Sequence, residues 1–519
     1  MGKLIFCCDG TGNEPEDAVQ KIDKDGGIED DNISNILKLH LLFGGTLDNG
    51  QIAFQDNQKS IYFRGVGTSG FIIRRALSQG LAVLDVRSII KAARKQLLEN
   101  YESGDEIFIF GFSRGAAIAR RFAALIRKEY SQEEAKLFEL QGEDKVRFMG
   151  VFDTVASIGF PHVLIHSQPK QDVVFEDGDG VSPIVKEALH LLSLDEKRTA
   201  FLPTLMQKDE RVTEIWFPGA HSDVGGGYYW DGLSDITLQF MIDEIGRRNL
   251  GLKVLSVDHV QYPCLRKKGV TINRDDLEII PNPLGKSHQQ DRVWPISEAT
   301  LIHRSVQVSG GGQDDLPLIH ESVISRINRD MTYRPDSLIR RRHKLWNSQG
   351  TGAVFNGLDD HVRDQPNRHY AMAVGESLEC DVYSYIFNNR CCVENNGGYL
   401  FVHPGETYEF SIDMGQRWYD SGIGCGPGGW NLKDVHLGLI KEEIIASMKN
   451  TRRCLRANWF EVVATVGLDG QPQRIVPVNG TLRTLQPATS GELFLFANDH
   501  PKKYGNNAGS IKVTIKRTA

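Results

Sequence analysis

The sequence predicts an α/β domain with a mostly parallel sheet and helices on both faces, followed by a C-terminal all-β sandwich. Between residues 3 and 250, short apolar runs alternate with amphipathic stretches, which is typical of strands and helices that alternate along the chain. From about residue 371, the runs alternate apolar and polar residues and are separated by Gly, Pro and Asn, which is typical of antiparallel strands. This change of texture predicts two domains.

The first part of the chain contains five predicted strands and two predicted helices. The strands are expected at residues 4–8, 60–67, 106–110, 146–152 and 213–217. The helices are expected at residues 81–99 and about 115–128, where apolar residues recur every three or four positions. In a parallel sheet of this kind, ligands collect at the carboxyl ends of the strands.

We expect a catalytic domain over residues 1–365 and a β-sandwich over residues 371–519. Pro- and Gly-rich pieces interrupt the pattern from about residue 250, which indicates a cap or linker that completes the first domain. The second domain contains segments such as YSYIF, TYEFSI, WFEVVATV and SIKVTIK, which suit the strands of a sandwich.

The composition excludes several classes of protein. The 519 residues are 40% hydrophobic and carry a net charge of −7, so we expect a globular protein with no nucleic-acid partner. Eight cysteines in 519 residues are too sparse for a disulfide scaffold, and they form no CxxC pair, which excludes a zinc ribbon. We expect no signal peptide and no transmembrane helix, and therefore a cytoplasmic location in the producing cell unless another route exports the protein.

Residues Gly111 to Gly115 read Gly-Phe-Ser-Arg-Gly and match the GxSxG pattern of serine hydrolases. The serine, Ser113, follows the predicted strand EIFIF directly and precedes the predicted helix AAIARRFAALIRK. This strand–turn–helix context exposes a serine hydroxyl above the sheet, and the two glycines allow the close backbone approach that the turn requires. The pattern predicts Ser113 as a nucleophile in an α/β-hydrolase-like domain.

A serine nucleophile needs a base and a carboxylate that orients the base. Asp153 follows the strand at 146–152, and His221 follows the strand at 213–217, which we take to be consecutive strands. The order Ser, Asp, His is that of α/β-hydrolases, so we expect Asp153 and His221 to complete a triad. His320 is an alternative base, and Asp223 is an alternative acid.

The oxyanion hole is expected to use the backbone N–H of Arg114 and one from the turn after the first strand, at Gly10. The alternative for this turn is a phosphate-binding loop. Neither a GxxxxGK[ST] motif nor a complete GxGxxG motif is present there, which disfavours nucleotide binding.

Six segments together resemble the catalytic domain of the type VI secretion phospholipase effectors of the first lipase-effector family. They are FCCDGTGN, YFRGVGT, GFSRGAAIARRFAALI, GVFDTVAS, SLDEKRTAFLPTL and WFPGAHSDVGGGY, and the resemblance covers about residues 1–340. The resemblance implies an α/β-hydrolase that cleaves acyl esters of phospholipids with Ser113, Asp153 and His221. It also implies an antibacterial effector exported by type VI secretion, with a secretion-apparatus component or an immunity protein as partner.

The C-terminal segment GTLRTLQPATSGELFLFANDHPKKYGNNAGSIKVTIKR is similar to the PA-I-type galactophilic lectins. Asp499, Asn506 and Asn507 offer oxygen atoms of the kind that calcium prefers. The resemblance implies a β-sandwich that binds a glycan through calcium, with the Lys503 carbonyl as a further ligand. The alternative is a metal-free sandwich that uses Asn506 and Asn507 as a turn.

Three functional hypotheses remain open on the sequence. The first is a phospholipase with a serine mechanism that needs no cofactor for catalysis. The second is a hydrolase of carbohydrate esters or small esters, targeted by the lectin-like tail. The third is a non-catalytic glycan-binding protein.

Overall fold

The structure is a computed structural model. It describes residues 2–10, 19–22, 28–47, 54–55, 57–65, 81–126, 140, 143–156, 180–266, 270, 272–288, 302–330, 332–347, 350–362, 369–393, 398–420, 422–433, 435, 451–468, 470–478, 480–501, 504 and 507–519.

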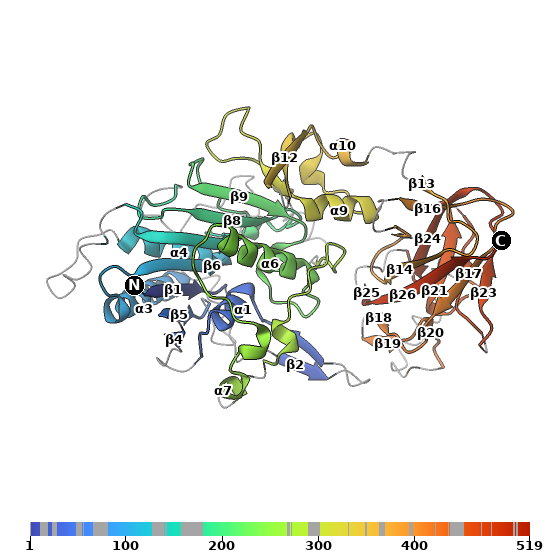
Figure 1. Cartoon of the computed structure of the whole chain (residues 1–519), viewed down its shortest axis with the longest axis horizontal. Helices are drawn as coiled ribbons and strands as arrows, with labels where there is room; N and C mark the ends of the chain where they lie inside the picture. Colours follow the sequence, from blue (N-terminus) through green and yellow to red (C-terminus); the bar gives the residue numbers. More distant parts are fainter. Residues whose placement is uncertain are drawn as a thin grey trace. The chain divides into compact units, whose positions relative to one another are not determined.

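The chain forms two compact units (Figure 1). The first contains Met1–Val323 and Pro335–Leu358, and the second contains Ile324–Arg334 and Asp359–Ala519. The division expected at residues 365–371 therefore lies close to a change of unit, while the segment Ile324–Arg334 packs with the C-terminal part of the chain. Which pieces of the chain fold alone stays a prediction.

A ten-stranded sheet forms the centre of the first unit, in the order β12-β11-β10-β9-β8-β7-β6-β1-β5-β4. Its strands are β1 (Lys3–Cys8), β4 (Phe54–Gln55), β5 (Gln58–Phe63), β6 (Glu106–Phe112), β7 (Val146–Phe152), β8 (Ala188–Ser193), β9 (Val212–Phe217), β10 (Leu318–His320), β11 (His343–Asn347) and β12 (Gly350–Phe355). The neighbours from β5 to β11 are parallel, and only the edge strands β4 and β12 pair antiparallel. The predicted mostly parallel sheet is confirmed.

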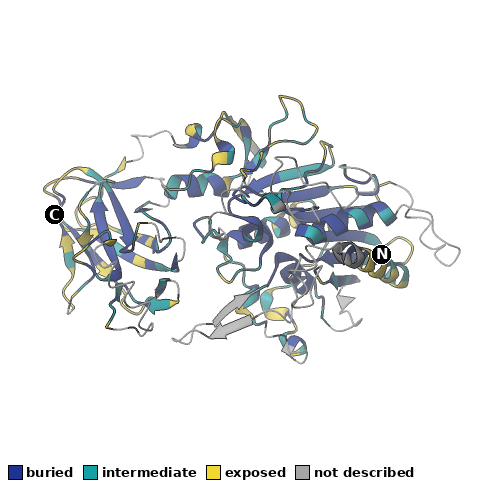
Figure 2. Cartoon of the chain, turned by 180° about the vertical axis from the view of Figure 1, so that it is seen from behind, coloured by how far each residue is buried: buried dark blue, intermediate teal, exposed yellow. Residues whose placement is uncertain are grey.

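Helices cover both faces of this sheet. Leu4, Phe6 and Cys8 of β1 pack in one core with α3 (Leu81–Asn100) and α4 (Ser113–Ile126). The intervening Ile5 and Cys7 pack in a second core with α1 (Asn35–Leu42) and α6 (Gly232–Arg247). Successive side chains of a strand point to opposite faces, so an unbroken apolar run such as LIFCC is what a strand buried on both faces requires. Figure 2 shows the central strands buried along most of their length.

The remaining elements of the first unit surround this sheet. They are the hairpin β2 (Val19–Ile22) and β3 (Ile28–Asp31), the helices α5 (His221–Gly225) and α7 (Tyr262–Arg266), and the short 3₁₀ turns Thr199–Phe201, Val257–His259, Asp275–Leu277 and Asp336–Leu338. Helix α9 (Glu321–Arg329) begins in the first unit and ends in the second. The region from about residue 250 thus adds β10, β11 and β12 to the sheet.

The sequence pattern missed one strand of the first unit. Strand β8, Ala188–Ser193, lies between β7 and β9, so Asp153 and His221 do not follow consecutive strands. Strand β5 ends at Phe63, within the run predicted as a strand that leads into a turn, and residues 66 and 67 lie outside the described residues. The β8 sequence ALHLLS is fully buried, but its central histidine breaks the apolar run that would have indicated a strand.

The second unit is a β-rich domain in which two main sheets share one apolar core. One sheet has the order β13-β16-β24-β21-β20 with β15 and β22 at its side, and the other has the order β14-β26-β17-β23. Residues of both sheets belong to one buried cluster, which includes Val462 and Leu495 of the first sheet and Val382, Phe410 and Val513 of the second. The C-terminal part of the chain is therefore β-rich, as predicted.

The strands of the second unit are short, and a third sheet of three strands has the order β19-β18-β25. The elements are α10 (Asp359–Val362), β13 (His369–Tyr370), β14 (Ser377–Tyr383), β15 (Asn389–Arg390), β16 (Tyr399–Val402), β17 (Tyr408–Ile412), β18 (Trp418–Asp420), β19 (Ile423–Cys425), β20 (Gly428–Trp430), β21 (Trp459–Val466), β22 (Gln473–Arg474), β23 (Arg483–Leu485), β24 (Gly491–Ala497), β25 (Asn507–Ala508) and β26 (Ser510–Arg517).

Two further properties of the chain concern its thiols and its helices. All eight cysteines are free thiols. Within the ranges described above, no helix combines the length and the apolar character needed to cross a membrane.

Candidate active site

Ser113 lies at a sharp turn between β6 and α4. Its φ of +57° is in the left-handed region that few non-glycine residues adopt. A Cβ atom at Gly115 would lie 2.3 Å from the carbonyl oxygens of Cys8 and Asp9, and one at Gly111 would lie 2.7 Å from the Cα of Ala116. Both glycines of the GxSxG pattern are therefore required sterically, and the strained turn presents the serine at the carboxyl end of the sheet.

His221 and Asp153 form a continuous chain of hydrogen bonds with Ser113. The distance from Ser113 Oγ to His221 Nε2 is 2.8 Å. The distance from His221 Nδ1 to Asp153 Oδ2 is 2.6 Å. The three side chains are buried, and the geometry is that of a nucleophile, a base and an orienting carboxylate.

The backbone holds Asp153 and His221 from two different loops. Asp153 follows β7 with a φ of +39°, and the N–H of Ser193, at the end of β8, donates to its Oδ1 at 3.0 Å. His221 is the first residue of α5, which follows β9. Helix α5 packs closely against the nucleophile turn. This is seen at Gly225, where an added Cβ atom would lie only 1.9 Å from the ring of Phe112.

Two aromatic rings enclose the imidazole of His221. The ring centroid of Phe112 lies 4.7 Å from that of His221. The rings of Phe201 and His221 meet edge to face, with their centroids 4.9 Å apart. Burial lowers the pKa of His221 below its usual 6.5, although the Asp153 carboxylate opposes this effect. This direction favours the neutral imidazole, which is the form that a general base needs.

Arg304 binds the carboxylate of Asp153 through both of its terminal nitrogens. Its Nη1 lies 2.6 Å from Oδ1, and its Nη2 lies 2.9 Å from Oδ2. The same guanidinium donates to the carbonyls of Ser193 and Phe201. Burial alone would raise the pKa of Asp153, but Arg304 and then His221 hold it well below its usual range. Sequence reasoning missed Arg304, because no spacing rule links it to a residue 151 positions earlier.

A second buried ion pair supports the base. Glu196 Oε2 accepts the backbone N–H of His221 at 3.2 Å and pairs with Arg198 Nη2 at 2.6 Å. The Arg198 guanidinium lies 3.6 Å from the centre of the Phe201 ring. The segment SLDEKRTAF therefore supplies a carboxylate, a guanidinium and an aromatic ring that fix the position of His221.

The two alternative site residues have other contacts. His320 Nδ1 lies 2.8 Å from Ser322 Oγ, and its ring stacks on Phe217 at a centroid distance of 4.4 Å. Asp223 accepts the N–H of Ala220 at 2.8 Å and lies 2.6 Å from His288 Nδ1. The structure thus brings His221 and Asp153 to Ser113, while Asp223 stabilises the turn that carries His221.

The predicted oxyanion donors, Arg114 and Gly10, lie at the start of α4 and just after β1. Arg114 is in the first turn of α4, where backbone N–H groups have no partner within the helix. The N–H of Gly10 donates to Asp9 Oδ1 at 2.6 Å. Asp9 is buried and also accepts hydrogen bonds from Ser34 and Tyr62, so it anchors the end of β1. The roles of Gly10 and Arg114 stay predictions.

The predicted calcium ligands are described in part. Asn507 Nδ2 lies 3.0 Å from Asp499 Oδ2, and both side chains are buried. The Oδ1 atom of Asn507 is buried and has no hydrogen-bond partner among the described residues. Such an oxygen next to a carboxylate suits a cation. Lys503 and Asn506 lie outside the described residues.

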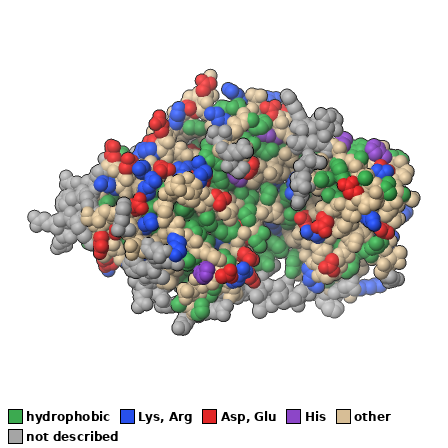
Figure 3. Space-filling view, in the orientation of Figure 1, with side chains coloured by type: hydrophobic (Ala, Val, Ile, Leu, Met, Phe, Trp, Pro, Cys, Tyr) green, Lys and Arg blue, Asp and Glu red, His purple; other side chains and the backbone are tan. Residues whose placement is uncertain are grey.

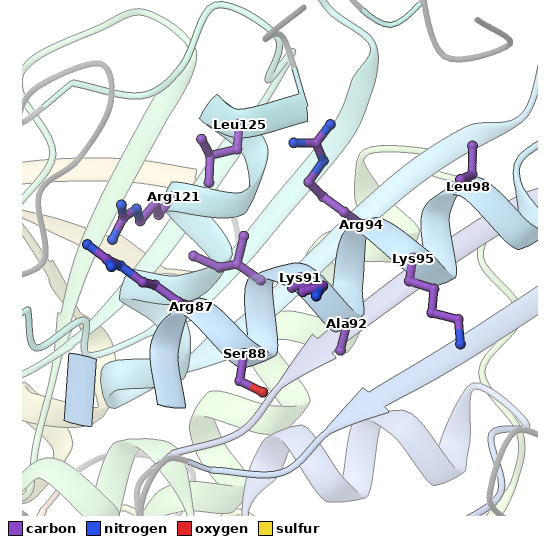
Figure 4. A pocket seen from close by; sticks show the side chains of 10 residues that line it. Arg87, Ser88, Lys91, Ala92, Arg94, Lys95, Leu98, Arg121 and Leu125 are labelled. Carbon is purple, nitrogen blue, oxygen red and sulfur yellow. The ribbon is translucent and has the colours of Figure 1, made fainter. Parts of the chain in front are cut away.

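A separate hollow of about 730 Å³ lies between α3 and α4. Figure 4 shows its basic lining, in which Arg87, Lys91, Arg94 and Lys95 come from α3 and Arg121 comes from α4. On the face of the molecule seen in Figure 3, basic and acidic side chains are interspersed. The hollow includes none of the residues of the Ser113 hydrogen-bond chain.

The first half of the chain resembles a known family. Residues 2–129 and 127–244 match the family model described as "T6SS, Phospholipase effector Tle1-like, catalytic domain". The chain is 29% identical over 249 residues to "Uncharacterized protein YEL023C" of Saccharomyces cerevisiae, a match that covers 38% of this chain and 32% of that protein. The match thus spans about a third of the length of that relative.

Three solved structures are similar to part of the chain. An uncharacterized protein from Pseudomonas aeruginosa is 19% identical, with 54% of this chain and 49% of that chain covered and a TM-score of 0.34. The Tle1 effector bound to the VgrG spike from the Type 6 secretion system is 24% identical, with coverages of 44% and 51% and a TM-score of 0.28. A structure reported for the lipolytic enzymes LipS and LipT is 12% identical, with coverages of 47% and 93% and a TM-score of 0.26.

Proposed function

We propose that this protein is a serine hydrolase that cleaves the acyl esters of phospholipids. The observation that carries the proposal is the buried hydrogen-bond chain from Ser113 through His221 to Asp153, with distances of 2.8 and 2.6 Å. The strained turn at Ser113 supports the role of nucleophile. The match of residues 2–244 to a phospholipase effector domain supports the substrate class.

In the proposed first step, the neutral His221 imidazole removes the proton from Ser113 Oγ as this oxygen attacks the ester carbonyl. The bond between Oγ and the carbonyl carbon forms, and the carbonyl oxygen becomes an oxyanion. His221 then gives the proton to the leaving alcohol as the ester bond breaks. Asp153 fixes the orientation of the imidazole and stabilises the imidazolium that forms in between.

The oxyanion is stabilised by backbone N–H groups at the start of α4, of which that of Arg114 is the proposed donor. A water molecule then gives a proton to His221 as its oxygen attacks the carbonyl carbon of the acyl-serine. The bond between this carbon and Ser113 Oγ breaks, His221 returns the proton to Oγ, and the fatty acid is released. The N–H of Gly10 joins as a second donor only if it leaves the Asp9 carboxylate, to which it donates in this structure.

The experiment is turnover of defined substrates by the full chain and by a Ser113→Ala variant. We expect release of fatty acid from phospholipid vesicles by the parent protein and none by the variant. A panel of short p-nitrophenyl esters and acetylated sugars separates the alternatives. Turnover of these soluble esters without attack on phospholipid would indicate a small-ester or carbohydrate esterase, and no turnover of either would indicate a binding protein.

The export and the partners of the protein are part of the same proposal. The family model describes effectors of type VI secretion, which supports a secretion-apparatus component as partner. An immunity protein is proposed as a further partner from the sequence resemblance alone. Co-expression with components of a type VI spike, followed by co-purification, tests the first of these.

Calcium-dependent glycan binding is a second candidate function, for the second unit. The unpartnered Oδ1 atom of Asn507 beside Asp499 favours it among the described residues. If calcium binds, these two side chains would hold it, and the ion would supply a coordination site for sugar hydroxyls. A glycan array probed with and without a chelator tests this function.

A further inference from the structure

The second unit contains a hollow with an unusual lining. It has a volume of about 1220 Å³ and lies between the loop before β21, the strand β22 and the turn before β23. Among the described residues, its lining includes five arginines and no acidic residue; the arginines are Arg452, Arg453, Arg456, Arg474 and Arg483. The chain as a whole carries a net charge of −7, so this is a local concentration of positive charge.

The five arginines differ in how they are held. Arg474 forms an ion pair with the buried Glu461 at 2.6 Å, and Arg453 lies 3.2 Å from the centre of the Phe496 ring. These two arginines help to hold the fold. For the other three, Arg452, Arg456 and Arg483, the described residues include no carboxylate in an ion pair.

Few contacts are described for those three arginines, and the Nε atom of Arg452 is buried. Arg452 lies 5.4 Å from the centre of the Trp459 ring and donates to a backbone carbonyl at 3.3 Å. Arg483 donates from Nε to a backbone carbonyl at 3.1 Å, and Arg456 is exposed. A guanidinium presents a planar fork of donors that matches the oxygens of a phosphate, and it gives up its hydration more easily than an ammonium.

Exposed apolar side chains lie among these arginines. Leu455 is 58% exposed, Val478 is 42% exposed and Leu482 is 40% exposed, and all three line the same hollow. Its volume exceeds the roughly 300–1,000 Å³ of a typical small-molecule site. Cationic and apolar side chains side by side are what the boundary of a membrane requires, where anionic phosphates lie above acyl chains.

We propose that this arginine-lined hollow docks the second unit on membranes that contain anionic phospholipids. The arginines bind headgroup phosphates, and Leu455, Val478 and Leu482 enter the apolar layer beneath. The inference rests on the proposed function, because it names the surface on which the substrate is found. It differs from the calcium-dependent glycan site, since it uses other residues and needs no metal.

The test measures sedimentation of the full chain with vesicles of phosphatidylcholine alone or with phosphatidylglycerol added, in the presence of a chelator. The Ser113→Ala protein is used throughout, so that no lipid is consumed and a failure of binding is separate from a failure of catalysis. We expect binding to the anionic vesicles only, weakening as salt is raised.

The decisive variant is Arg456→Gln with Arg483→Gln, which removes two cations that have no carboxylate partner among the described residues. The partition coefficient on anionic vesicles should fall about 30-fold, because each arginine near an anionic surface contributes about fivefold. The double change Leu455→Ser with Leu482→Ser should lower it about tenfold.

The matched control is Arg87→Gln with Lys91→Gln in the hollow of Figure 4. This control removes the same amount of charge from the first unit. Its partition coefficient on anionic vesicles should stay within twofold of the Ser113→Ala value. Circular dichroism of each variant checks that the fold is kept.

Several results would overturn the proposal. These are equal binding to neutral vesicles, an equal loss in the control pair, or full binding by the Arg456→Gln and Arg483→Gln protein. Vesicle binding that requires calcium would show that the membrane contact is made by a site other than the arginine-lined hollow. Capture of an acidic protein or a nucleic acid in place of vesicles, abolished by the same arginine changes, would also overturn it.

Discussion

The two units of this protein place their functional side chains in opposite ways. In the first unit, Ser113, His221 and Asp153 are buried and linked through hydrogen bonds. In the second unit, the arginine-lined hollow consists mostly of loop residues that are exposed or half-buried. This difference suits the two proposed roles, because catalysis needs a fixed geometry, which burial supplies, whereas contact with a large surface needs accessible charge and apolar area.

The largest expected effect is the loss of catalysis on removal of the triad. Ser113→Ala and His221→Ala should each lower kcat by about 10⁶-fold, because each removes a group that acts only together with the others. The measurement is turnover of a soluble ester. His320→Ala is the matched control and should cost less than about tenfold, since His320 stacks on Phe217 and hydrogen-bonds to Ser322. A larger loss of kcat in His320→Ala than in His221→Ala would assign the role of base to His320.

The next largest effect concerns the packing at the nucleophile turn. Gly115→Ala should lower the free energy of unfolding by about 1–3 kcal/mol, because its Cβ atom would lie 2.3 Å from two backbone oxygens. Chemical denaturation measures this change. Gly246→Ala in α6 is the control, since a Cβ atom there has no described neighbour within 4 Å and alanine favours a helix. Equal stability of the two variants would contradict the close packing of the turn.

Arg304 allows the role of electrostatics in the buried site to be tested. Arg304→Gln should reduce kcat/KM about 10- to 100-fold, since it removes two hydrogen bonds that position Asp153 and leaves only those with Ser193 and His221. Arg304 also lowers the pKa of His221, so its removal should raise that pKa. The base acts only when neutral, so the acid limb of the pH profile should move to higher pH in the variant. Arg304→Lys keeps the positive charge, so its acid limb should lie close to that of the parent protein.

In the parent protein, kcat/KM should fall at low pH with a midpoint below 6.5. The reason is that burial lowers the pKa of His221, and activity disappears when the imidazole becomes protonated. A pH series on a soluble ester measures the midpoint. A midpoint well above the usual pKa of histidine would show that the base is more solvated than the structure indicates.

The smallest expected effect belongs to the second unit. If Asp499 and Asn507 bind calcium, millimolar calcium should raise the Tm of the second unit's unfolding transition by a few degrees through mass action. Asp499→Ala should abolish the rise, while Asp413→Ala on an exposed turn should leave it unchanged. A calcium-independent Tm would favour a metal-free sandwich, and the hollow of arginines would then be the main functional surface of this unit.

The buried site could be predicted from the sequence better than the exposed one. Ser113, Asp153 and His221 could be identified because local signals, namely a glycine-flanked turn and polar residues at strand ends, point to them. Arg304 could not be identified, because its contact with Asp153 depends on the tertiary fold across 151 residues. Strand β8 was missed because a buried histidine interrupts its apolar run.

The arginine-lined hollow illustrates the opposite case. Its arginines come from two stretches of chain, 452–456 and 474–483, and the pairing of β21 with β22 helps to bring these stretches together. Each stretch alone resembles an ordinary solvated loop. Only the fold shows that their cations and exposed leucines line one surface.

The most direct test of the central claim is the chemical identity of the nucleophile. The full chain is treated with a fluorophosphonate, digested, and analysed by mass spectrometry to locate the modified residue. We predict a single phosphonylated serine, Ser113, with labelling strongly slowed in the His221→Ala protein. Modification of another serine, or labelling of Ser113 at the same rate without His221, would contradict the proposed triad.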